Sequence, residues 1–429
     1  MPTTVLLTPA ARLRGEVTVP GDKSISHRAL VLATMARGRS RIEGRARGAD
    51  QDSMVGALRA LGAGVSEDGD VTGVEGVELT GLRSPAADID CGNSGATMRF
   101  LAGALAGIEG VSATLIGDSS LSRRPMDRVA GPLRRMGAEV ETWADGMPPL
   151  RVSGRHLRGV EHRLEVASAQ VKTAILLAAL NAEGETSVVA PPSRDHTERM
   201  LRRLGVDIEI GGTIRLRPPD HLPAFEMSVP GDPSSAAFWV VLAAAHPDAE
   251  LVVRNVCLNP SRAGFLAVLG RMGAAVEMFD TREVGGEAVA DILVRSASLT
   301  ATDVDAEEVP AVVDEVPVLA VAAASAQGES RFRGLGELRV KEVDRLAAIA
   351  AGLGRMGVAV ELSGDDMLVR GGAPIRGADL GSGGDHRMAM SLAIAATLAH
   401  EPSRLDGGDA ADVSYPGFFQ QLDALTGSR

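Results

Sequence analysis

Two short sequence elements recur along this chain of 429 residues, and this repetition constrains its fold more than any other feature. The first element is a phrase such as LGAGV or MGAEV, which follows a helix-like segment and leads into a strand-like one; its sixth and last copy, LTG, is degraded. A glycine after the last helical turn is the usual left-handed cap, so each phrase predicts a helix end followed by a strand. Successive phrase glycines lie 75, 68, 68, 84 and 70 residues apart and are Gly62, Gly137, Gly205, Gly273, Gly357 and Gly427.

The second element is an Ala-rich apolar stretch that begins with small or charged polar residues. A helix that is apolar on every side is one that its neighbours bury. Because both elements keep one order at a period of about 70 residues, they predict six copies of one helix-and-strand unit, where chance in an Ala/Gly-rich chain would scatter them. A chain of this length exceeds what one core usually supports, so we expect an α/β protein of two domains with three units each. The copies are GDKSISHRALVLATMARG, GNSGATMRFLAGALAG, ASAQVKTAILLAALNAEG, GDPSSAAFWVVLAAAHP, DEVPVLAVAAASAQG and GDHRMAMSLAIAATLAH.

Charge and composition exclude several classes of function. A formal net charge of -12 and an aromatic content of 3% disfavour a nucleic-acid partner. Cys91 and Cys257 stand far apart without metal-ligand spacing, which indicates a reducing compartment and no zinc site. The first residues lack a signal-peptide core and the apolar stretches are shorter than a membrane span, so we expect a cytoplasmic protein. P-loop, GxSxG and HExxH motifs are absent, and we interpret His27 and His386 as structural hydrogen-bonders.

The polar residues at the starts of the apolar segments are candidates for chemistry. A helix N-terminus presents free N–H groups and a partial positive charge, so several such termini directed toward one cleft would bind anions. Capping explains serines and aspartates at these positions, but it does not explain Lys23 or Arg387, because a cation is disfavoured there unless an anion compensates it. The candidates are Lys23, Ser24, Arg28, Asn93, Ser94, Gly95, Ser168, Gln170, Asp314 and Arg387.

Two further segments carry clustered cations. In ELRVKEVDRL, a helix would place Lys341 and Arg345 four residues apart, where like charges repel unless a bound anion or the neighbouring acids balance them. The segment GDSSLSRRPM contributes Arg123 and Arg124 ahead of a proline. Each segment is compatible with an anion site and with solvated surface.

Nine motifs in collinear order over nearly the whole chain resemble the 5-enolpyruvylshikimate-3-phosphate synthase family, in the style of its class II bacterial branch. The resemblance implies the enolpyruvyl transferase fold, in which two similar domains each hold three βαβαββ-type repeats with buried parallel helices, an inside-out α/β barrel-like arrangement. It implies a first domain over 21–229, a second over 1–20 with 230–429, and an active site in the interdomain cleft. The motifs are VPGDKSISHR, GNSGATMRF, GDSSLSRRPM, ASAQVKTAILLA, SRDHTERM, VPGDPSSAAF, DEVPVLAVAAA, LRVKEVDRL and GDHRMAMS.

The resemblance also implies a reaction. The enolpyruvyl group of phosphoenolpyruvate would pass to the 5-hydroxyl of shikimate 3-phosphate with release of phosphate, a step of the shikimate pathway of aromatic amino-acid biosynthesis. No metal and no cofactor is implied, because the C–O bond breaks and phosphate leaves from a tetrahedral intermediate. The implied partners are the two small-molecule substrates and the inhibitor glyphosate, with no nucleic acid or membrane, and the implied state is a monomer.

Matching positions imply roles for individual residues. Asp314 would take the proton of the attacking hydroxyl, Glu342 would protonate the methylene carbon, and Lys23 would contact both substrates. Burial would have to favour the protonated form of Glu342 for this role. The implied contacts of shikimate 3-phosphate are Lys23, Ser24, Arg28, Ser168, Gln170, Arg194, Asp314 and Lys341. Those of phosphoenolpyruvate are Lys23, Gly95, Arg124 (chosen over Arg123 because it directly precedes the proline), Gln170, Arg345 and Arg387.

Two positions qualify the resemblance. Some family members carry a C-terminal lysine that contacts phosphoenolpyruvate, and here VSYPGFF places Val413 at that position. Gly95 is the small residue whose replacement by alanine crowds out glyphosate in tolerant relatives, so we expect this protein to be sensitive to glyphosate.

Two other readings remain open from the sequence. UDP-N-acetylglucosamine enolpyruvyl transferase shares the architecture and the donor but uses a reactive loop cysteine, and neither Cys91 nor Cys257 lies in a segment that looks like an exposed loop. A non-catalytic anion-binding scaffold would keep the helix starts, and the intact set of Asp314, Lys341 and Glu342 argues against it.

Overall fold

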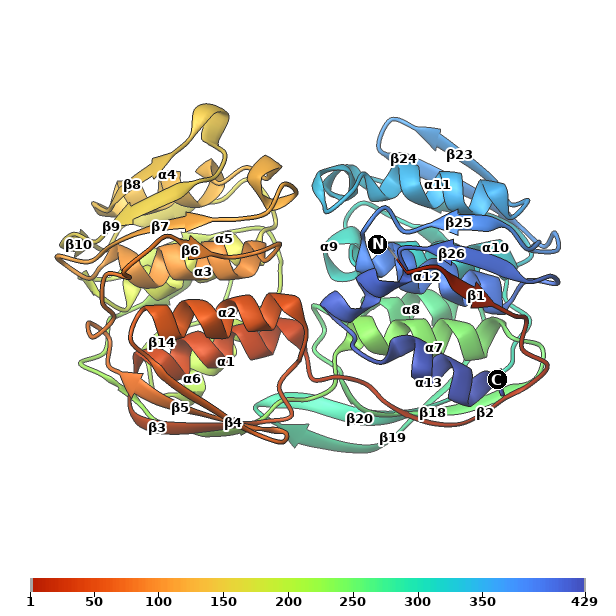
Figure 1. Ribbon diagram of the computed structural model, residues 1–429, viewed down its shortest axis with the longest axis horizontal. Helices are drawn as coiled ribbons and strands as arrows, with labels where there is room; N and C mark the ends of the chain where they lie inside the picture. The colour runs from red at the N-terminus through yellow and green to blue at the C-terminus, as the bar shows by residue number, and fades with distance from the viewer. Residues whose placement is uncertain (1–2, 428–429) are drawn as a thin grey trace. The chain divides into compact units, whose positions relative to one another are not determined.

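The computed structural model describes residues 3–427, which divide into two compact units. The N-terminal unit comprises Gly21–Val229 together with Val284–Gly286. The C-terminal unit comprises the residues up to Pro20, the segment Pro230–Glu283 and the residues from Glu287 onward. In each unit strands and helices alternate along the chain (Figure 1).

The N-terminal unit contains short strands and six α-helices. Its helices are α1 (Lys23–Met35), α2 (Ala49–Ala60), α3 (Gly95–Ala106), α4 (Asp127–Met136), α5 (Ala169–Ala179) and α6 (His196–Arg203), with 3-10 turns η1 (Leu121–Arg123) and η2 (Ala144–Gly146). Its strands are β3 (Ala36–Glu43), β4 (Gly64–Asp68), β5 (Val71–Val77), β6 (Ile89–Asp90), β7 (Ser112–Ile116), β8 (Glu139–Thr142), β9 (Leu150–Ser153), β10 (Leu157–Arg158), β11 (Glu161–Arg163), β12 (Ala182–Glu183), β13 (Thr186–Val189), β14 (Ile208–Glu209), β15 (Ile214–Leu216), β16 (Leu222–Pro223) and β17 (Glu226–Ser228).

The three repeats of this unit share one strand order. In the second repeat β6 runs parallel to β7, and β9 and β8 follow antiparallel, which gives β6-β7-β9-β8. The third repeat has the corresponding order β11-β13-β15-β14. In the first repeat β3, β5 and β4 take the same places, but the parallel partners of β3 are β16 and β17, with Leu222 opposite Ala36 and Met227 opposite Ile42. The end of the unit therefore closes back onto its first repeat.

The C-terminal unit repeats this plan. Its helices are α7 (Pro233–Ala245), α8 (Gly264–Arg271), α9 (Val309–Val312), α10 (Val316–Ser325), α11 (Arg345–Arg355), α12 (His386–Thr397) and α13 (Phe418–Thr426), with 3-10 turns η3 (Gly336–Val340) and η4 (Gly408–Val413). Its strands are β1 (Val5–Leu7), β2 (Leu13–Thr18), β18 (Ala249–Cys257), β19 (Ala275–Val284), β20 (Glu287–Arg295), β21 (Asp303–Val304), β22 (Gly328–Phe332), β23 (Ala359–Ser363), β24 (Asp366–Gly371), β25 (Asp379–Gly381) and β26 (Ser403–Asp406).

Two of the three sheets of the C-terminal unit are completed by strands that precede Gly21 in the chain. β2 runs parallel to β18 in the order β19-β20-β18-β2, and β1 pairs antiparallel with β26, which runs parallel to β25. The remaining repeat has the order β21-β22-β24-β23, and all four of its strands come from the segment after Glu287. These strand orders confirm the predicted α/β class with three repeats in each unit.

The Ala-rich helices are buried along almost their whole length, as their sequences predict. Every residue of α7 from Pro233 to Ala244 is buried. In the N-terminal unit α3 and α5 pack so closely that a Cβ on Gly103 would lie 2.2 Å from the carbonyl oxygen of Ala174, so only glycine fits at this crossing. In the C-terminal unit α7, α10 and α12 pack against one another (Figure 1).

The prediction about the repeated glycines is also confirmed. Each phrase glycine has a positive φ, from 68° at Gly427 to 111° at Gly137, which is the left-handed region that ends a helix. A side chain with a Cβ would be strained at these positions, so the phrase marks the turn from helix to strand in each repeat.

Candidate active site

Three helix N-termini gather in the N-terminal unit. Each is capped by the side chain of the residue that precedes the helix: Asp22 accepts from the backbone N–H of Ile25 on α1 over 2.8 Å, and Ser94 accepts from Thr97 on α3 over 3.2 Å. Ser168 caps α5 in the same way. Capping therefore accounts for these three polar side chains, and the remaining residues at the helix starts are those that need another explanation.

Lys23 is compensated by an acid that the sequence reading did not single out. Its Nζ forms an ion pair with the carboxylate of Asp50, in the first turn of α2. Asp50 is buried, so the pair lies in a partly dehydrated environment where charges interact more strongly than in water. The carboxylate of Asp50 therefore supplies the negative charge that compensates Lys23 at the start of α1.

The hydroxyl and carbonyl groups of Ser24 bring two arginines together. Arg194 donates to Ser24 Oγ over 3.0 Å, and Arg28 Nη1 donates to the Ser24 carbonyl over 2.9 Å. Arg194 comes from the loop before α6, so residues about 170 apart in sequence meet at the start of α1. The structure thus places three residues from two distant motifs in one cluster.

Gly95 faces a second pair of arginines. A Cβ built on Gly95 would lie 2.7 Å from Nη1 of Arg99 and 3.6 Å from Nη1 of Arg124. Arg99 also donates to Oε1 of Gln170. Arg124 donates to Oδ1 of Asn93 over 2.6 Å. Arg99 was missed by sequence reasoning, although it stands in the quoted motif GNSGATMRF. We name the N-terminal cluster as Lys23, Ser24, Arg28, Gly95, Arg124, Ser168, Gln170 and Arg194.

His27 joins the helix starts of α1 and α3. Its Nδ1 lies 2.8 Å from the Lys23 carbonyl and 2.5 Å from Nε2 of Gln51, while its Nε2 lies 3.3 Å from Ser94 Oγ. Burial lowers the pKa of His27 to about 4, so the ring is neutral near neutral pH. The interpretation of His27 as a structural hydrogen-bonder is confirmed.

In the C-terminal unit, Arg345 is the centre of an ion-pair network. Its side chain is 2% exposed, and Nε donates to Asp385 over 2.7 Å. Nη2 donates to Glu342 over 2.6 Å, and Nη1 donates to Asp314 over 3.4 Å. Burial by itself would lower the pKa of this guanidinium, but the attraction of the three carboxylates outweighs burial and raises the pKa. Arg345 is therefore a permanent buried cation.

Asp314 stands among three cations. Besides Arg345, Lys341 Nζ lies 3.9 Å from Oδ1 of Asp314, and Arg387 Nη2 lies 3.5 Å from Oδ2. Arg387 also donates to the Asp314 carbonyl over 2.9 Å, and its Nη1 lies 3.6 Å from Glu315. We name the C-terminal cluster as Asp314, Lys341, Glu342, Arg345 and Arg387.

The expectation that Lys341 and Arg345 share one helix is wrong. Lys341 has extended backbone angles and follows the 3-10 turn η3, whereas α11 begins only at Arg345. Asp344 explains the break, because its carboxylate caps α11 by accepting from the backbone N–H of Ala347 over 3.0 Å. The two cations approach Asp314 from separate elements.

The cysteines do not offer a reactive thiol. Cys91 and Cys257 are both free and buried. Burial, with a smaller contribution from Asp90, raises the pKa of the Cys91 thiol to about 12. A thiol of that pKa is neither a thiolate nor a useful proton donor at neutral pH, which disfavours the cysteine-dependent transferase chemistry.

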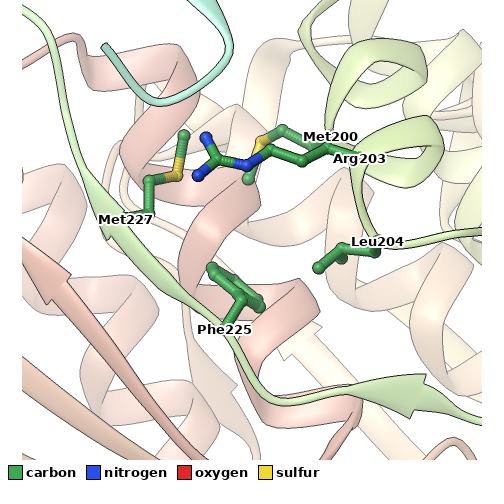
Figure 2. A pocket seen from close by; sticks show the side chains of 5 residues that line it. All are labelled: Met200, Arg203, Leu204, Phe225 and Met227. Carbon is green, nitrogen blue, oxygen red and sulfur yellow. The ribbon is translucent and has the colours of Figure 1, made fainter.

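Other features of the structure lie outside the clusters. Figure 2 shows a small pocket where the guanidinium of Arg203 extends between the side chains of Met200 and Met227, with Leu204 and Phe225 nearby. None of the residues of the N-terminal cluster lines it. Val413, where some relatives carry lysine, ends the 3-10 turn η4 and is half-buried. Among residues 3–427, no helix combines the length and the apolar character needed to cross a membrane.

Comparison with known proteins matches nearly the whole chain to one family. The sequence model of the family described as EPSP synthase (3-phosphoshikimate 1-carboxyvinyltransferase) matches residues 7–422. A 3-phosphoshikimate 1-carboxyvinyltransferase from Synechococcus sp. (strain WH7803) is 51% identical over 421 residues, which are 96% of each chain. One from Roseiflexus sp. (strain RS-1) is 48% identical over 97% of this chain and 98% of its own. The solved structure of EPSP synthase from Acinetobacter baumannii superposes with a TM-score of 0.88 at 38% identity, covering 99% of this chain and 98% of that one.

Proposed function

Because the chain belongs to the EPSP synthase family, we propose that its N-terminal and C-terminal clusters are the two halves of one active site that act together on phosphoenolpyruvate and shikimate 3-phosphate. The chain transfers the enolpyruvyl group of phosphoenolpyruvate to the 5-hydroxyl of shikimate 3-phosphate and releases phosphate.

The N-terminal cluster supplies most of the residues that bind shikimate 3-phosphate. Both substrates are polyanions, and guanidinium groups pair with phosphate and carboxylate through two parallel hydrogen bonds. Ser24, held between two arginines, supports this assignment, since a phosphate can replace the serine as the acceptor of Arg194. The residues assigned to shikimate 3-phosphate are Lys23, Ser24, Arg28, Ser168, Gln170, Arg194, Asp314 and Lys341.

Phosphoenolpyruvate is assigned to cations of both clusters. Gly95 places no side chain beside the guanidinium groups of Arg99 and Arg124, and Arg345 and Arg387 supply fixed positive charge in the other cluster. Lys23 is shared by both substrates, so binding of an anion must displace Asp50 from it. The residues assigned to phosphoenolpyruvate are Lys23, Gly95, Arg124, Gln170, Arg345 and Arg387.

The chemistry needs a base and an acid on different faces of the reacting atoms. Asp314 is the base: it takes the proton of the 5-hydroxyl while that oxygen bonds to C2 of phosphoenolpyruvate, and Lys341 helps to hold this substrate. Glu342 is the acid: it gives a proton to the C3 methylene, which becomes a methyl group in the tetrahedral intermediate. C3 then returns its proton, the C2–O bond to phosphate breaks, and phosphate leaves.

One observation supports both roles: Asp314 and Glu342 contact the same guanidinium. Arg345 contacts Asp314 through Nη1 and Glu342 through Nη2. The pairing with Arg345 favours the ionised form of Glu342. When the carboxylate of phosphoenolpyruvate takes over part of Arg345, Glu342 loses that stabilisation and can accept the proton it must donate. Glu342 is thus protonated, and able to act as an acid, only when its substrate binds.

Finer features belong to the same proposal. The lack of a side chain at Gly95, beside the guanidinium groups of Arg99 and Arg124, supports sensitivity to glyphosate, which is also an anion. Two free cysteines, both buried, support a reducing compartment such as the cytoplasm. A monomer is proposed because both clusters are supplied by one chain.

Steady-state release of phosphate tests the proposal. The wild-type protein is expected to release phosphate only when both substrates are present, and Lys23→Met is expected to abolish release by weakening the binding of both. Tight binding of shikimate 3-phosphate without release would instead indicate an anion-binding scaffold. Full activity of Lys23→Met would refute the role of Lys23.

A further inference from the structure

Two threonines that the family resemblance does not assign lie behind Arg28. Arg28 Nε donates to Thr197 Oγ1 over 2.7 Å, and Nη2 donates to Thr173 Oγ1 over 2.9 Å. The two hydroxyl oxygens are 2.6 Å apart. Arg28 is 3% exposed and each threonine is 1% exposed. Three groups from α1, α5 and α6 therefore form one buried hydrogen-bonded triangle.

The triangle fixes the plane of the guanidinium. Both hydroxyl oxygens accept from Arg28, and one hydroxyl donates its proton to the other. Nη1 is held by the Ser24 carbonyl, and the Phe100 ring covers the group with its centroid 4.9 Å from Cζ. A free arginine side chain samples many rotamers, so a guanidinium held at all three nitrogens has lost that entropy before a ligand arrives.

A second cross-link joins the same two helices one residue away. Lys172 Nζ on α5 lies 2.6 Å from Glu198 Oε1 on α6, with side chains 4% and 1% exposed. A buried ion pair contributes little to stability compared with apolar residues of the same volume, and its best-attested use is to select one register. Here it fixes the two turns that carry Thr173 and Thr197.

We propose that Thr173 and Thr197 are positioning residues for shikimate 3-phosphate. They hold the guanidinium of Arg28 in the orientation that binds the substrate, and the Lys172–Glu198 ion pair keeps α5 and α6 in the register that brings the two hydroxyls together. This inference rests on the proposed role of Arg28.

Calorimetric titration with shikimate 3-phosphate tests the threonines. Thr197→Val removes the acceptor at constant volume and is expected to weaken binding about 10-fold to 100-fold, as the loss of a hydrogen bond to a charged group does. Thr173→Val is expected to act likewise, and Thr197→Ser is expected to restore binding. The KM for phosphoenolpyruvate and kcat at saturating shikimate 3-phosphate should change less than twofold. Thr34→Val is the matched control, because Thr34 is buried on the same helix as Arg28 and its hydroxyl has no hydrogen-bond partner.

A double-mutant cycle separates positioning from general stabilisation. In an Arg28→Ala background, Thr197→Val is expected to have no further effect on the dissociation constant. An equal loss in both backgrounds, or wild-type binding by Thr197→Val, would overturn the inference. If Arg28→Ala itself binds shikimate 3-phosphate as the wild type does, the proposed role of Arg28 fails, and this outcome is distinct from the first.

The ion pair is tested by removing both charges together. Lys172→Met combined with Glu198→Leu is expected to leave the urea midpoint of unfolding unchanged or raise it, while weakening shikimate 3-phosphate binding. A structural role alone would lower the midpoint and leave binding intact, and that result would remove the ion pair from the inference.

Discussion

Glu342 accepts a 2.6 Å hydrogen bond from Nη2 of Arg345, a guanidinium whose side chain is 2% exposed. The same group holds Asp385 through Nε and reaches Asp314 through Nη1. One buried cation thus contacts three carboxylates from separate segments of the C-terminal unit. This arrangement links stability to chemistry, because the residue that neutralises the proposed acid and base also holds their segments together.

Replacement of Arg345 by methionine should destabilise the C-terminal unit. Three carboxylates would lose their common partner, and breaking a buried network of this kind costs about 3–5 kcal/mol. Urea unfolding measures this loss. Arg339→Met is the control: Arg339 pairs with Asp344 and Asp365 at the surface, where ion pairs contribute little, so its loss should cost far less stability. Equal losses in the two variants would contradict the account of Arg345.

Replacement of Gly95 by alanine should separate binding from stability. Gly95 begins α3, and its φ is not in the left-handed region, so the backbone accepts alanine. The new methyl would lie 2.7 Å from the end of the Arg99 side chain, which can move. We expect thermal stability to stay the same or rise, while the KM for phosphoenolpyruvate and the inhibition constant for glyphosate both increase by about tenfold or more.

Gly131→Ala is the matched control for Gly95, since Gly131 lies inside α4 and a Cβ there would meet nothing within 4 Å. It should gain up to about 1 kcal/mol of stability and leave both constants unchanged. An unaltered KM and inhibition constant in Gly95→Ala, or a wild-type enzyme that is unaffected by millimolar glyphosate, would contradict the assignment of this site.

The N-terminal unit should lose stability in mild acid. Burial, with a smaller contribution from Arg135, lowers the pKa of His162 to about 4, and neither ring nitrogen of His162 has a hydrogen-bond partner. Because the unfolded chain binds the proton at about pH 6.5, stability is fully present above that pH and is lost as the pH falls toward 4. The loss for one such histidine is about 2 kcal/mol between about pH 8 and pH 5.

Urea midpoints of His162→Leu at these two pH values measure this contribution. The variant should lose less stability on acidification than the wild type, whereas His221→Gln, at an exposed position of the same unit, should behave as the wild type does. His27, with a pKa also of about 4, adds a second contribution that His162→Leu leaves in place. An unchanged pH dependence in His162→Leu would show that the ring is not buried in its neutral form.

Local chemistry made the repeat plan predictable from the sequence. A glycine such as Gly137 ends a helix because its backbone adopts a φ that other residues avoid, and this requirement is visible in one short phrase. The burial of α7 is visible in the same way, since a helix without a polar face must be covered by neighbours. The glycines and the apolar helices together also predicted where the helices begin, and so which polar residues lie at their starts.

Long-range partners were not predictable in this way. The helical reading of Lys341 and Arg345 failed because Asp344 caps the helix from within the segment, a competing local interaction of similar strength. Asp50, which compensates Lys23, and Arg99, which faces Gly95, depend on how separate repeats pack, and no spacing in the sequence encodes that. The substrate contacts of both clusters stay predictions.

The most direct test of the proposed chemistry is the fate of a proton at C3 of phosphoenolpyruvate. If Glu342 protonates the methylene carbon from a solvent-exchanged carboxyl group, then wild-type protein in deuterium oxide with both substrates should place deuterium on that carbon, detected by mass spectrometry. Glu342→Gln should place none there while still binding shikimate 3-phosphate, and Glu337→Gln, in the preceding turn η3, should incorporate deuterium as the wild type does. Deuterium incorporation by Glu342→Gln at the wild-type rate would contradict the account.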